Sequence, residues 1–236
     1  MQLFYNSNIE PNTTQITFDK IESNHIVRVL RKKEGDVLKI TNGKGFLFDA
    51  EITIASDKKC MAKIISKEQK NKPWNYYLHI AIAPTKLNDR MEWFLEKATE
   101  IGIDEITPII CQNSERRVVK TERFEKIIQS AMKQSLKFTL PKLNAPLKFD
   151  EFINQNFDGK VCIAHCEVAE HKNLFKKVVN PSEKTTILIG PEGDFSLDEI
   201  KKALNKKYIP ISLGESRLRT ETAGLVAVNM VSFMNQ

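Results

Sequence analysis

The stretch ILIGPEGDFS, residues 187–196, carries the strongest local signals in the chain. Its first three residues are apolar and indicate the end of a buried strand. A Gly-Pro turn with a second glycine follows, and Ser196 with Glu199 predicts a capping box at the start of the next helix. Two glycines let a ligand approach the backbone closely, so this turn is a candidate binding loop. An ordinary strand-to-helix turn explains the same spacing equally well.

A second stretch, ISLGESRLRTETAG at residues 211–224, again shows a strand that ends at a glycine. A polar loop follows, and a helix is predicted over 221–234 that is apolar on nearly all sides. Such a helix is buried, either in its own domain or in a subunit interface. Two arginines stand directly before it, where a charged residue seldom lies without a partner or a role. For the second of them, Arg219, the alternative is a structural ion pair with Glu221 or Glu192.

Strands and helices alternate through the whole chain after Pro73. This pattern predicts a parallel sheet whose two faces are covered by helices. In such sheets ligands bind beyond the carboxyl ends of the strands, where both glycine loops lie. The expected strands are 76–83, 106–111, 161–165, 185–189 and 209–213. The expected helices are 89–101 with an Asp89/Glu92 capping box, 121–137 with Thr121 as its N-cap, 169–179, 197–207 and 221–234.

The earlier part of the chain shows a different pattern. Val37–Thr41 and the alternation of apolar residues from Phe46 to Ile54 predict two strands joined by a turn. A third strand is expected at 60–65 and one short helix at 23–31. Several short strands with one helix predict a small β-barrel or sandwich.

A polar, charged run from Lys67 to Pro73 separates the two patterns and predicts a linker. We therefore expect one domain over 1–70 and another over 74–236. Residues 1–72 carry 13 Lys and Arg against 9 Asp and Glu, and the remainder carries 23 against 21, within a net charge of +6. A mild positive excess that is denser at the front suits a polyanionic partner, although a basic protein with a solvated surface has the same composition.

The composition excludes several classes of protein. With 236 residues, 41% hydrophobic and 28% charged, the chain is typical of globular proteins and not of disordered or disulfide-rich ones. No apolar run reaches the ~18 residues of a membrane span, and the first residues lack the features of a signal peptide. Four scattered cysteines indicate reduced thiols, so we expect a cytoplasmic protein with no membrane attachment.

The two glycine loops also exclude common ligands. Neither matches the triphosphate loop G-x-x-x-x-G-K-[ST], and no G-x-G-x-x-G follows a strand. A neutral-to-cationic nucleoside held by backbone groups fits them better. Cys162, His165, Cys166 and His171 are metal ligands by type, but the alternation of a strand directs His165 to the face opposite both cysteines. Because zinc needs its ligands to converge, we expect no metal site.

The short N-terminal helix carries a candidate RNA contact. On a regular helix, Arg28, Arg31 and Lys32 share one face, and Val29 and Leu30 anchor the other face in the core. Such a basic face can contact phosphates. A solvated charged face accounts for the same residues equally well.

Taken together, these segments resemble the RsmE family of ribosomal RNA small-subunit methyltransferases, in the SPOUT superfamily. The resemblance covers the whole chain. The matching segments are LIGPEG at 188–193, LGxxxLRTETA at 213–223, HxxxVLR at 25–31, MEW at 91–93, KATEIG at 97–102, and Gln134-Ser135 followed by Pro141.

The resemblance implies both a fold and a reaction. The fold is a PUA-like β-barrel that helps to hold RNA, followed by a SPOUT-type α/β domain, a parallel sheet with a trefoil knot. The protein would be a homodimer that transfers a methyl group from S-adenosylmethionine to N3 of one uridine of 16S rRNA, in the assembled small ribosomal subunit. The implied S-adenosylmethionine contacts are Ile189, Gly190, Glu192, Gly193, Leu213, Gly214, Leu218, Thr220 and Thr222.

The reaction assigns roles to two further residues. The acceptor nitrogen must lose its proton, and negative charge then spreads to the neighbouring carbonyl oxygens. Arg219 is the candidate for stabilising that charge, and Glu221 is the candidate for orienting Arg219 or for acting as a base through water. Two alternatives are a non-catalytic RNA-binding or ribosome-assembly factor with a vestigial pocket, and a nucleotide-dependent enzyme.

Two positions depart from the family pattern. Asp194 stands where many members have glycine. Lys137 stands where arginine is expected, which puts one RNA contact in question because lysine lacks the bidentate fork of arginine.

Overall fold

The computed structural model describes residues 2–167 and 172–236. The chain forms two compact units, one of which contains the residues up to Pro73 together with Met132–Leu140. The second contains Trp74–Ala131 and Pro141–Gln236. The domain boundaries that we predict at residues 70 and 74 stay a prediction. The inclusion of Met132–Leu140 in the first unit has no local sequence signal.

Main-chain hydrogen bonds attach this distant segment to the first unit. The Gly45 N–H donates to the carbonyl of Phe138 at 2.8 Å, and the Leu140 N–H donates to the carbonyl of Gly43 at 2.8 Å. The segment therefore pairs with the turn between two strands of the first unit.

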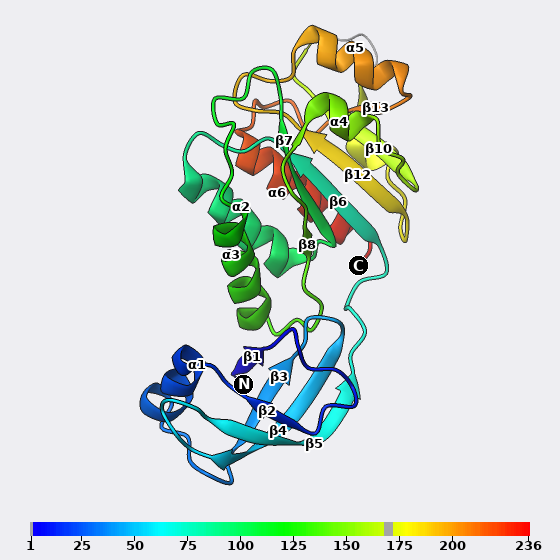
Figure 1. The fold of residues 1–236 in the computed structure, drawn as a ribbon. Coiled ribbons are helices and arrows are strands. Elements are labelled where there is room, and N and C mark those ends of the chain that lie inside the picture. Colours follow the sequence, from blue (N-terminus) through cyan, green and yellow to red (C-terminus); the bar gives the residue numbers. More distant parts are fainter. Residues whose placement is uncertain (1, 168–171) are drawn as a thin grey trace. The chain divides into compact units, whose positions relative to one another are not determined.

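The first unit contains a curled five-stranded sheet in the order β1-β3-β4-β5-β2, antiparallel except for β1 against β3 (Figure 1). The alternation predicted from Phe46 to Ile54 is confirmed as far as Ile52, because Phe48, Ala50 and Ile52 are fully buried in its core. It is wrong at Ile54, which is 45% exposed after a shift in strand register. The last predicted strand is longer than expected and includes the start of the predicted linker, so the linker prediction is wrong for residues 67–69. These polar residues pair with Phe46–Phe48 and expose their side chains. The strands are β1 Leu3–Tyr5, β2 Gln15–Thr17, β3 Val37–Thr41, β4 Phe46–Ile54 and β5 Met61–Gln69.

The helix of the first unit is irregular. It consists of α1, Lys20–Asn24, followed by a π-turn, His25–Val29, in which the Leu30 N–H donates to the carbonyl of His25. A π-turn contains an additional residue, so the faces expected of a regular α-helix are rotated. Val29 is consequently 63% exposed, and the prediction that it anchors the helix in the core is wrong.

The second unit contains a sheet in which every described pairing is parallel, as predicted. Its order is β11-β13-β10-β12-β6-β7-β8, with β9 also pairing with β7. The strands are β6 Tyr77–Ile82, β7 Glu105–Ile110, β8 Lys142–Leu143, β9 Leu147–Lys148, β10 Lys160–Ala164, β11 Asn173–Leu174, β12 Lys184–Ile189 and β13 Ile209–Ser212. The helices are α2 Asn88–Ile101, α3 Thr121–Gln134, α4 Phe149–Ile153, a 3-10 turn Phe175–Lys177, α5 Leu197–Asn205 and α6 Thr220–Phe233.

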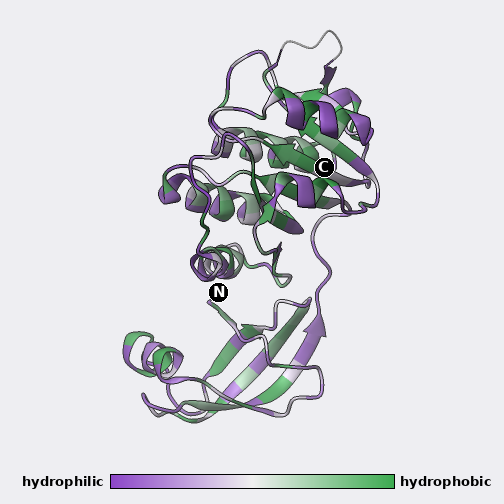
Figure 2. Cartoon of the chain, turned by 45° about the horizontal axis from the view of Figure 1, so that its top comes forward, coloured by the Kyte–Doolittle hydropathy of each residue, from purple (hydrophilic) through white to green (hydrophobic). Residues whose placement is uncertain are grey.

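Helices cover both faces of this sheet, and its strands are apolar between them (Figures 1 and 2). Phe149 and Phe152 of α4 and Ile200 of α5 pack into one core with Ala81 and Leu188. On the other face α6 lies against α2 and β6. A Cβ at Gly224 would stand 2.8 Å from the ring of Phe94 and 2.9 Å from Ile82, so only glycine permits this close approach.

The observed helix ends confirm one of the predicted helix caps and contradict two others. The Ser196/Glu199 capping box is confirmed, since both of its hydrogen bonds are present. The Asp89/Glu92 capping box is wrong, because α2 begins one residue earlier, after Leu87, with no side-chain cap. Thr121 is the first residue of α3 and not its N-cap, and α3 ends at Gln134 because Leu136 has a left-handed φ of 53°.

The helix predicted over 169–179 is also wrong where it can be compared. Residues 168–171 lie outside the described part of the chain, and the residues that follow form β11 and the 3-10 turn. The predicted C-terminal helix is confirmed to within one residue at each end as α6. Among the helices of the described residues, none combines the length and apolarity needed to cross a membrane. The trefoil knot stays a prediction.

Candidate functional site

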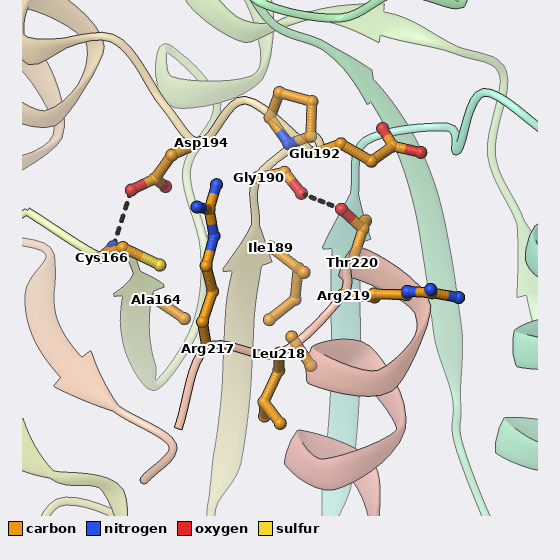
Figure 3. A pocket seen from close by; sticks show the side chains of 12 residues that line it. Ala164, Cys166, Ile189, Gly190, Glu192, Asp194, Arg217, Leu218, Arg219 and Thr220 are labelled. Atoms are coloured by element: carbon orange, nitrogen blue, oxygen red, sulfur yellow. Dashed lines mark hydrogen bonds between the residues drawn. The ribbon is translucent and has the colours of Figure 1, made fainter. Parts of the chain in front are cut away.

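Two adjoining cavities open at the carboxyl ends of β10, β12 and β13, beside the start of α6. Figure 3 shows the residues that line the smaller one. The smaller has a volume of about 240 Å³ and the larger about 580 Å³. They adjoin because both are lined by Ala164, Cys166, Asp194, Arg217, Leu218 and Ala223. This is the edge of a parallel sheet where ligands are expected.

The loop after β12 is held in one shape by short-range contacts. A Cβ at Gly190 would stand 3.0 Å from the ring of Phe195, so a larger residue would displace that buried ring. The buried Thr220 hydroxyl, at the start of α6, donates to the carbonyl of Gly190 at 3.0 Å (Figure 3). The loop and the helix that follow two different strands are thereby joined.

Asp194 shows why a departure from glycine is tolerated here. Its φ of 62° lies in the left-handed region, which favours glycine but also admits aspartate. Its carboxylate accepts hydrogen bonds from the Cys166 N–H at 2.7 Å and from the Phe195 N–H at 2.8 Å. These bonds to the charged group offset the backbone strain and connect the loop to the end of β10.

Other contacts fix the same loop from the opposite side. Glu192 accepts a hydrogen bond from the Lys86 N–H at 2.9 Å, which leaves its Oε2 buried with no hydrogen-bond partner among the described residues. The Asn113 side chain donates to the carbonyls of Gly193 and Asp194 at 3.2 and 3.1 Å. The site is therefore preorganised by side-chain-to-backbone bonds between three strand-end loops.

Most of the predicted nucleoside contacts line the cavities. Ile189, Gly190, Glu192, Leu218 and Thr220 line the smaller one, and Leu213 and Gly214 line the larger. Gly214 has a φ of 143°, and a Cβ there would meet no atom within 4 Å, so its backbone is open to a ligand.

Two predicted contacts do not line either cavity. Gly193 faces the Asn113 side chain, which a Cβ would approach to 3.3 Å. Thr222 lies in the first turn of α6, half-buried. Both lie directly beside lining residues, and their roles stay predictions.

The sequence patterns missed the residues contributed by β10. Ala164, His165 and Cys166 line the cavities because β10 lies between β12 and β13 in the sheet. The carboxyl-end rule applies to every strand, but the order of strands has no signal in a single sequence. Asp194 and Arg217 were also not among the predicted contacts, although both lie within the loops that the patterns indicated.

Arg219 and Glu221 have different surroundings. Arg219 precedes α6, is exposed, and forms no ion pair within residues 2–167 and 172–236. Figure 3 shows Arg217 extending toward the loop after β12, and Arg219 pointing away from Asp194. Glu221 is buried, with its Oε1 3.9 Å from the Arg90 Nε and its Oε2 without a partner in the described part of the chain.

These contacts show whether Arg219 forms a structural ion pair. The structural ion pair of Arg219 with Glu221 or Glu192 is not formed, and Glu221 lies against Arg90 instead. The charge of the Arg219 guanidinium is therefore not neutralised by a carboxylate of the described residues. The catalytic roles of Arg219 and Glu221 stay predictions.

The predicted basic face of the first unit is changed by the π-turn. Arg31 has a left-handed φ of 55° and, with Lys32, lies beyond the end of the helix, so the expected common helical face is wrong. Arg28 donates from Nε and Nη2 to Asp57 at 2.8 and 2.7 Å. This ion pair holds the pKa of Asp57 below its usual value. The phosphate-contact roles of Arg28, Arg31 and Lys32 stay predictions.

The possible metal ligands are not gathered together. No group of three His, Cys, Asp or Glu side chains suited to a metal occurs within the described residues. Cys162 is buried, and burial raises the pKa of its thiol to about 12. Cys166 is exposed at the cavity, and His171 lies outside the described residues.

Comparison with known proteins gives consistent matches over both units. A family model described as an RNA methyltransferase domain matches residues 72–232, and one described as an RNA methyltransferase PUA domain matches residues 18–65. The ribosomal RNA small subunit methyltransferase E of Buchnera aphidicola is 33% identical over 229 residues, which cover 93% of this chain and 88% of that protein.

Solved structures agree with these matches. A structure described as a probable rRNA-methyltransferase from Porphyromonas gingivalis has a TM-score of 0.93 and 43% identity, and covers 100% of this chain and 98% of its own. A ribosomal RNA small subunit methyltransferase E from Neisseria gonorrhoeae, bound to S-adenosyl methionine, has a TM-score of 0.84 and 25% identity, with 99% and 98% of the two chains covered. The N-terminal sheet is accordingly PUA-like and the parallel sheet is of the SPOUT type. Sequence and fold together show that this chain belongs to the ribosomal RNA small subunit methyltransferase E family.

Proposed function

We propose that this protein transfers a methyl group from S-adenosylmethionine to N3 of a specific uridine in the 16S rRNA of the small ribosomal subunit. The observation that carries the proposal is the pair of cavities at the carboxyl ends of the strands, in a chain whose relatives are named as small-subunit rRNA methyltransferases. The RNA methyltransferase relative from Neisseria gonorrhoeae binds S-adenosyl methionine. The proposed substrate of this protein places the reaction in the cytoplasm, where the small subunit is assembled.

The cavities have the chemistry that this methyl donor requires. The donor is a nucleoside with a sulfonium cation. The larger and smaller cavities of the protein together have a volume in the range of small-molecule sites. The buried Oε2 of Glu192, which has no hydrogen-bond partner among the described residues, supplies negative charge on one side. The open backbone at Gly214 supplies polar groups on the other.

The residues that would hold the donor follow from this fit. Bound there, S-adenosylmethionine supplies an electrophilic methyl group. The lining residues named above bind it, and Gly193 and Thr222 lie beside those residues in the chain. The proposed contacts are Ile189, Gly190, Glu192, Leu213, Gly214, Leu218 and Thr220.

Arg219 is proposed to stabilise the acceptor. When uridine loses the N3 proton, negative charge develops on the carbonyl oxygens beside that nitrogen, and a positioned cation lowers the free energy of the transition state. The absence of an ion pair for Arg219 in the described part of the chain supports this role, because its charge is not already neutralised.

Glu221 is proposed to accept the proton, through a water molecule. Its contact with Arg90 and not with Arg219 argues against an orienting role. Its Oε2 is buried and accepts no hydrogen bond from the described residues, which supports a role as an acceptor.

The test is single-turnover methyl transfer from labelled donor to undermethylated 30S subunits, with the modified base identified by mass spectrometry. Arg219→Ala should lower the rate of transfer ~100-fold, the usual effect of removing one such donor, while donor affinity measured by calorimetry changes far less. Arg219→Lys retains the charge without the fork and should fall between. A loss of donor affinity in proportion to the rate would place Arg219 in the donor site, and a methyl group on another atom would refute the uridine-N3 assignment.

We also propose a homodimer that buries part of α6. Phe233 is 71% exposed, and Leu225, Val226 and Met230 are only half-buried, although all four are apolar. Light scattering at micromolar concentration should give the mass of a dimer, and Phe233→Glu should shift it toward a monomer. A monomeric wild-type protein would refute this part of the proposal.

A further inference from the structure

His165 is a buried side chain whose polar atoms have no partner. It directly follows β10, is 7% exposed, and lines the larger of the two cavities. Neither Nδ1 nor Nε2 has a hydrogen-bond partner among residues 2–167 and 172–236. Buried polar atoms are almost always hydrogen-bonded, so two nitrogens without a partner among the described residues, in a side chain that lines a cavity, point to a hydrogen-bonding group bound there.

The other buried histidine of the described residues provides a comparison. His79 is 4% exposed, and its Nε2 lies 2.7 Å from the hydroxyl of Thr107. One nitrogen of that imidazole therefore has a partner within the protein itself. His165 differs because no described residue forms a hydrogen bond with either of its nitrogens.

The environment of His165 selects the kind of group that can bind it. Burial lowers the pKa of His165, and the nearby Lys172 lowers it further, against the smaller opposing effects of Asp194 and Glu167. A neutral imidazole donates one hydrogen bond and accepts one. Its best partner is a neutral group that also donates and accepts, such as a ribose hydroxyl or the edge of a purine. The charged ends of an amino acid are better matched by Lys172 and Glu167, which line the same cavity.

We propose that the imidazole of His165 hydrogen-bonds the adenosine portion of S-adenosylmethionine. This inference rests on the proposed position of the methyl donor in these cavities. It adds a contact with the methyl donor from the residue that follows β10. The contacts predicted from the glycine loops include no residue from this strand end.

Calorimetry with two ligands tests it. S-adenosylmethionine contains the adenosine and the amino acid, whereas 5′-methylthioadenosine contains the adenosine without the amino acid. His165→Ala should weaken both ligands equally, by about 10-fold, the effect of losing a hydrogen bond to a buried site. His165→Gln keeps a donor and an acceptor and should retain most of the affinity, while His165→Phe fills the space without them and should behave like the alanine variant.

The outcomes separate this inference from the proposed function. Unchanged affinity of His165→Ala for both ligands would refute it, and so would a loss confined to S-adenosylmethionine, which would assign His165 to the amino-acid end. A wild-type protein that binds neither ligand would refute the proposed function as well. If the alanine and phenylalanine variants fail to fold, the nitrogen resonances of His165 in the wild-type protein, assigned by their absence in His165→Gln, should shift when 5′-methylthioadenosine is added, and unshifted resonances would refute the contact.

Discussion

Replacing Thr220 by valine should loosen the connection between α6 and the loop after β12. Valine has nearly the same shape as threonine, so the substitution removes one hydroxyl and leaves the packing intact. That hydroxyl donates to the Gly190 carbonyl at 3.0 Å, and Thr220 is only 4% exposed. In the variant the carbonyl faces an apolar methyl group.

The expected cost follows from this geometry. A buried carbonyl that loses its partner destabilises the folded state by about 1–3 kcal/mol. In a unit of this size each kcal/mol lowers the Tm by roughly 2–4 °C. The two tryptophans of the chain, Trp74 and Trp93, both lie in the second unit, so their fluorescence during urea or thermal unfolding reports on that unit. Affinity for S-adenosylmethionine should fall as well, because Gly190 and Thr220 line the smaller cavity.

A matched control is available in α2. The Thr99 hydroxyl is also buried and donates to the Leu95 carbonyl at 2.7 Å. That carbonyl already accepts the helical hydrogen bond of Thr99 itself, so Thr99→Val leaves no orphaned group. Thr220→Val should therefore cost clearly more than Thr99→Val. Equal effects in the two variants, with donor affinity unchanged, would refute the view that this hydrogen bond organises the site.

Two further predictions concern charge. Burial lowers the pKa of His79 to about 4, so as the pH falls the unfolded chain takes up this proton before the folded chain does. The folded state therefore loses roughly 3 kcal/mol of stability between about pH 6.5 and about pH 4. His79→Gln should flatten the pH dependence of the unfolding free energy in that window, and an unchanged slope would contradict the assignment. Arg28→Ala should weaken RNA binding and lower the slope of log affinity against log salt by ~1, whereas Asp57→Asn should release Arg28 from its ion pair and tighten binding at low salt. If neither variant changes the slope of log affinity against log salt, Arg28 only forms a solvated ion pair with Asp57 and does not contact RNA.

The elements that could be predicted from sequence are those set by local chemistry. The strand over Val37–Thr41, the turn from β12 into α5, and the apolar helix α6 all follow from periodicity, caps and glycines within a few residues. The helix over 23–31 was only partly predictable, because a π-turn inserts a residue without changing the residue types involved. No periodic pattern distinguishes the two cases.

The parts of the site that escaped prediction depend on contacts between distant residues. Arg28 and Asp57 are 29 positions apart, and Cys166 and Asp194 are 28 apart. His165 and Cys166 enter the site only because β10 lies between β12 and β13. Local patterns predicted the glycine loops and singled out Arg219, but neither those patterns nor the family resemblance pointed to the end of β10.

The charges of the site are arranged so that neither sign neutralises the other. Glu192 and Asp194 are held by main-chain N–H groups, of Lys86, Cys166 and Phe195, and not by arginine. In the described part of the chain Arg217 and Arg219 form no ion pair, although both line the smaller cavity with those carboxylates. Backbone dipoles stabilise a carboxylate without cancelling its charge, so the site can offer negative charge to a cationic donor and positive charge to an acceptor that becomes anionic. Had the arginines formed ion pairs with the carboxylates, each charge would have been neutralised by the other. The methyl transfer that we propose, from a cationic donor to an acceptor that becomes anionic, requires that they are not.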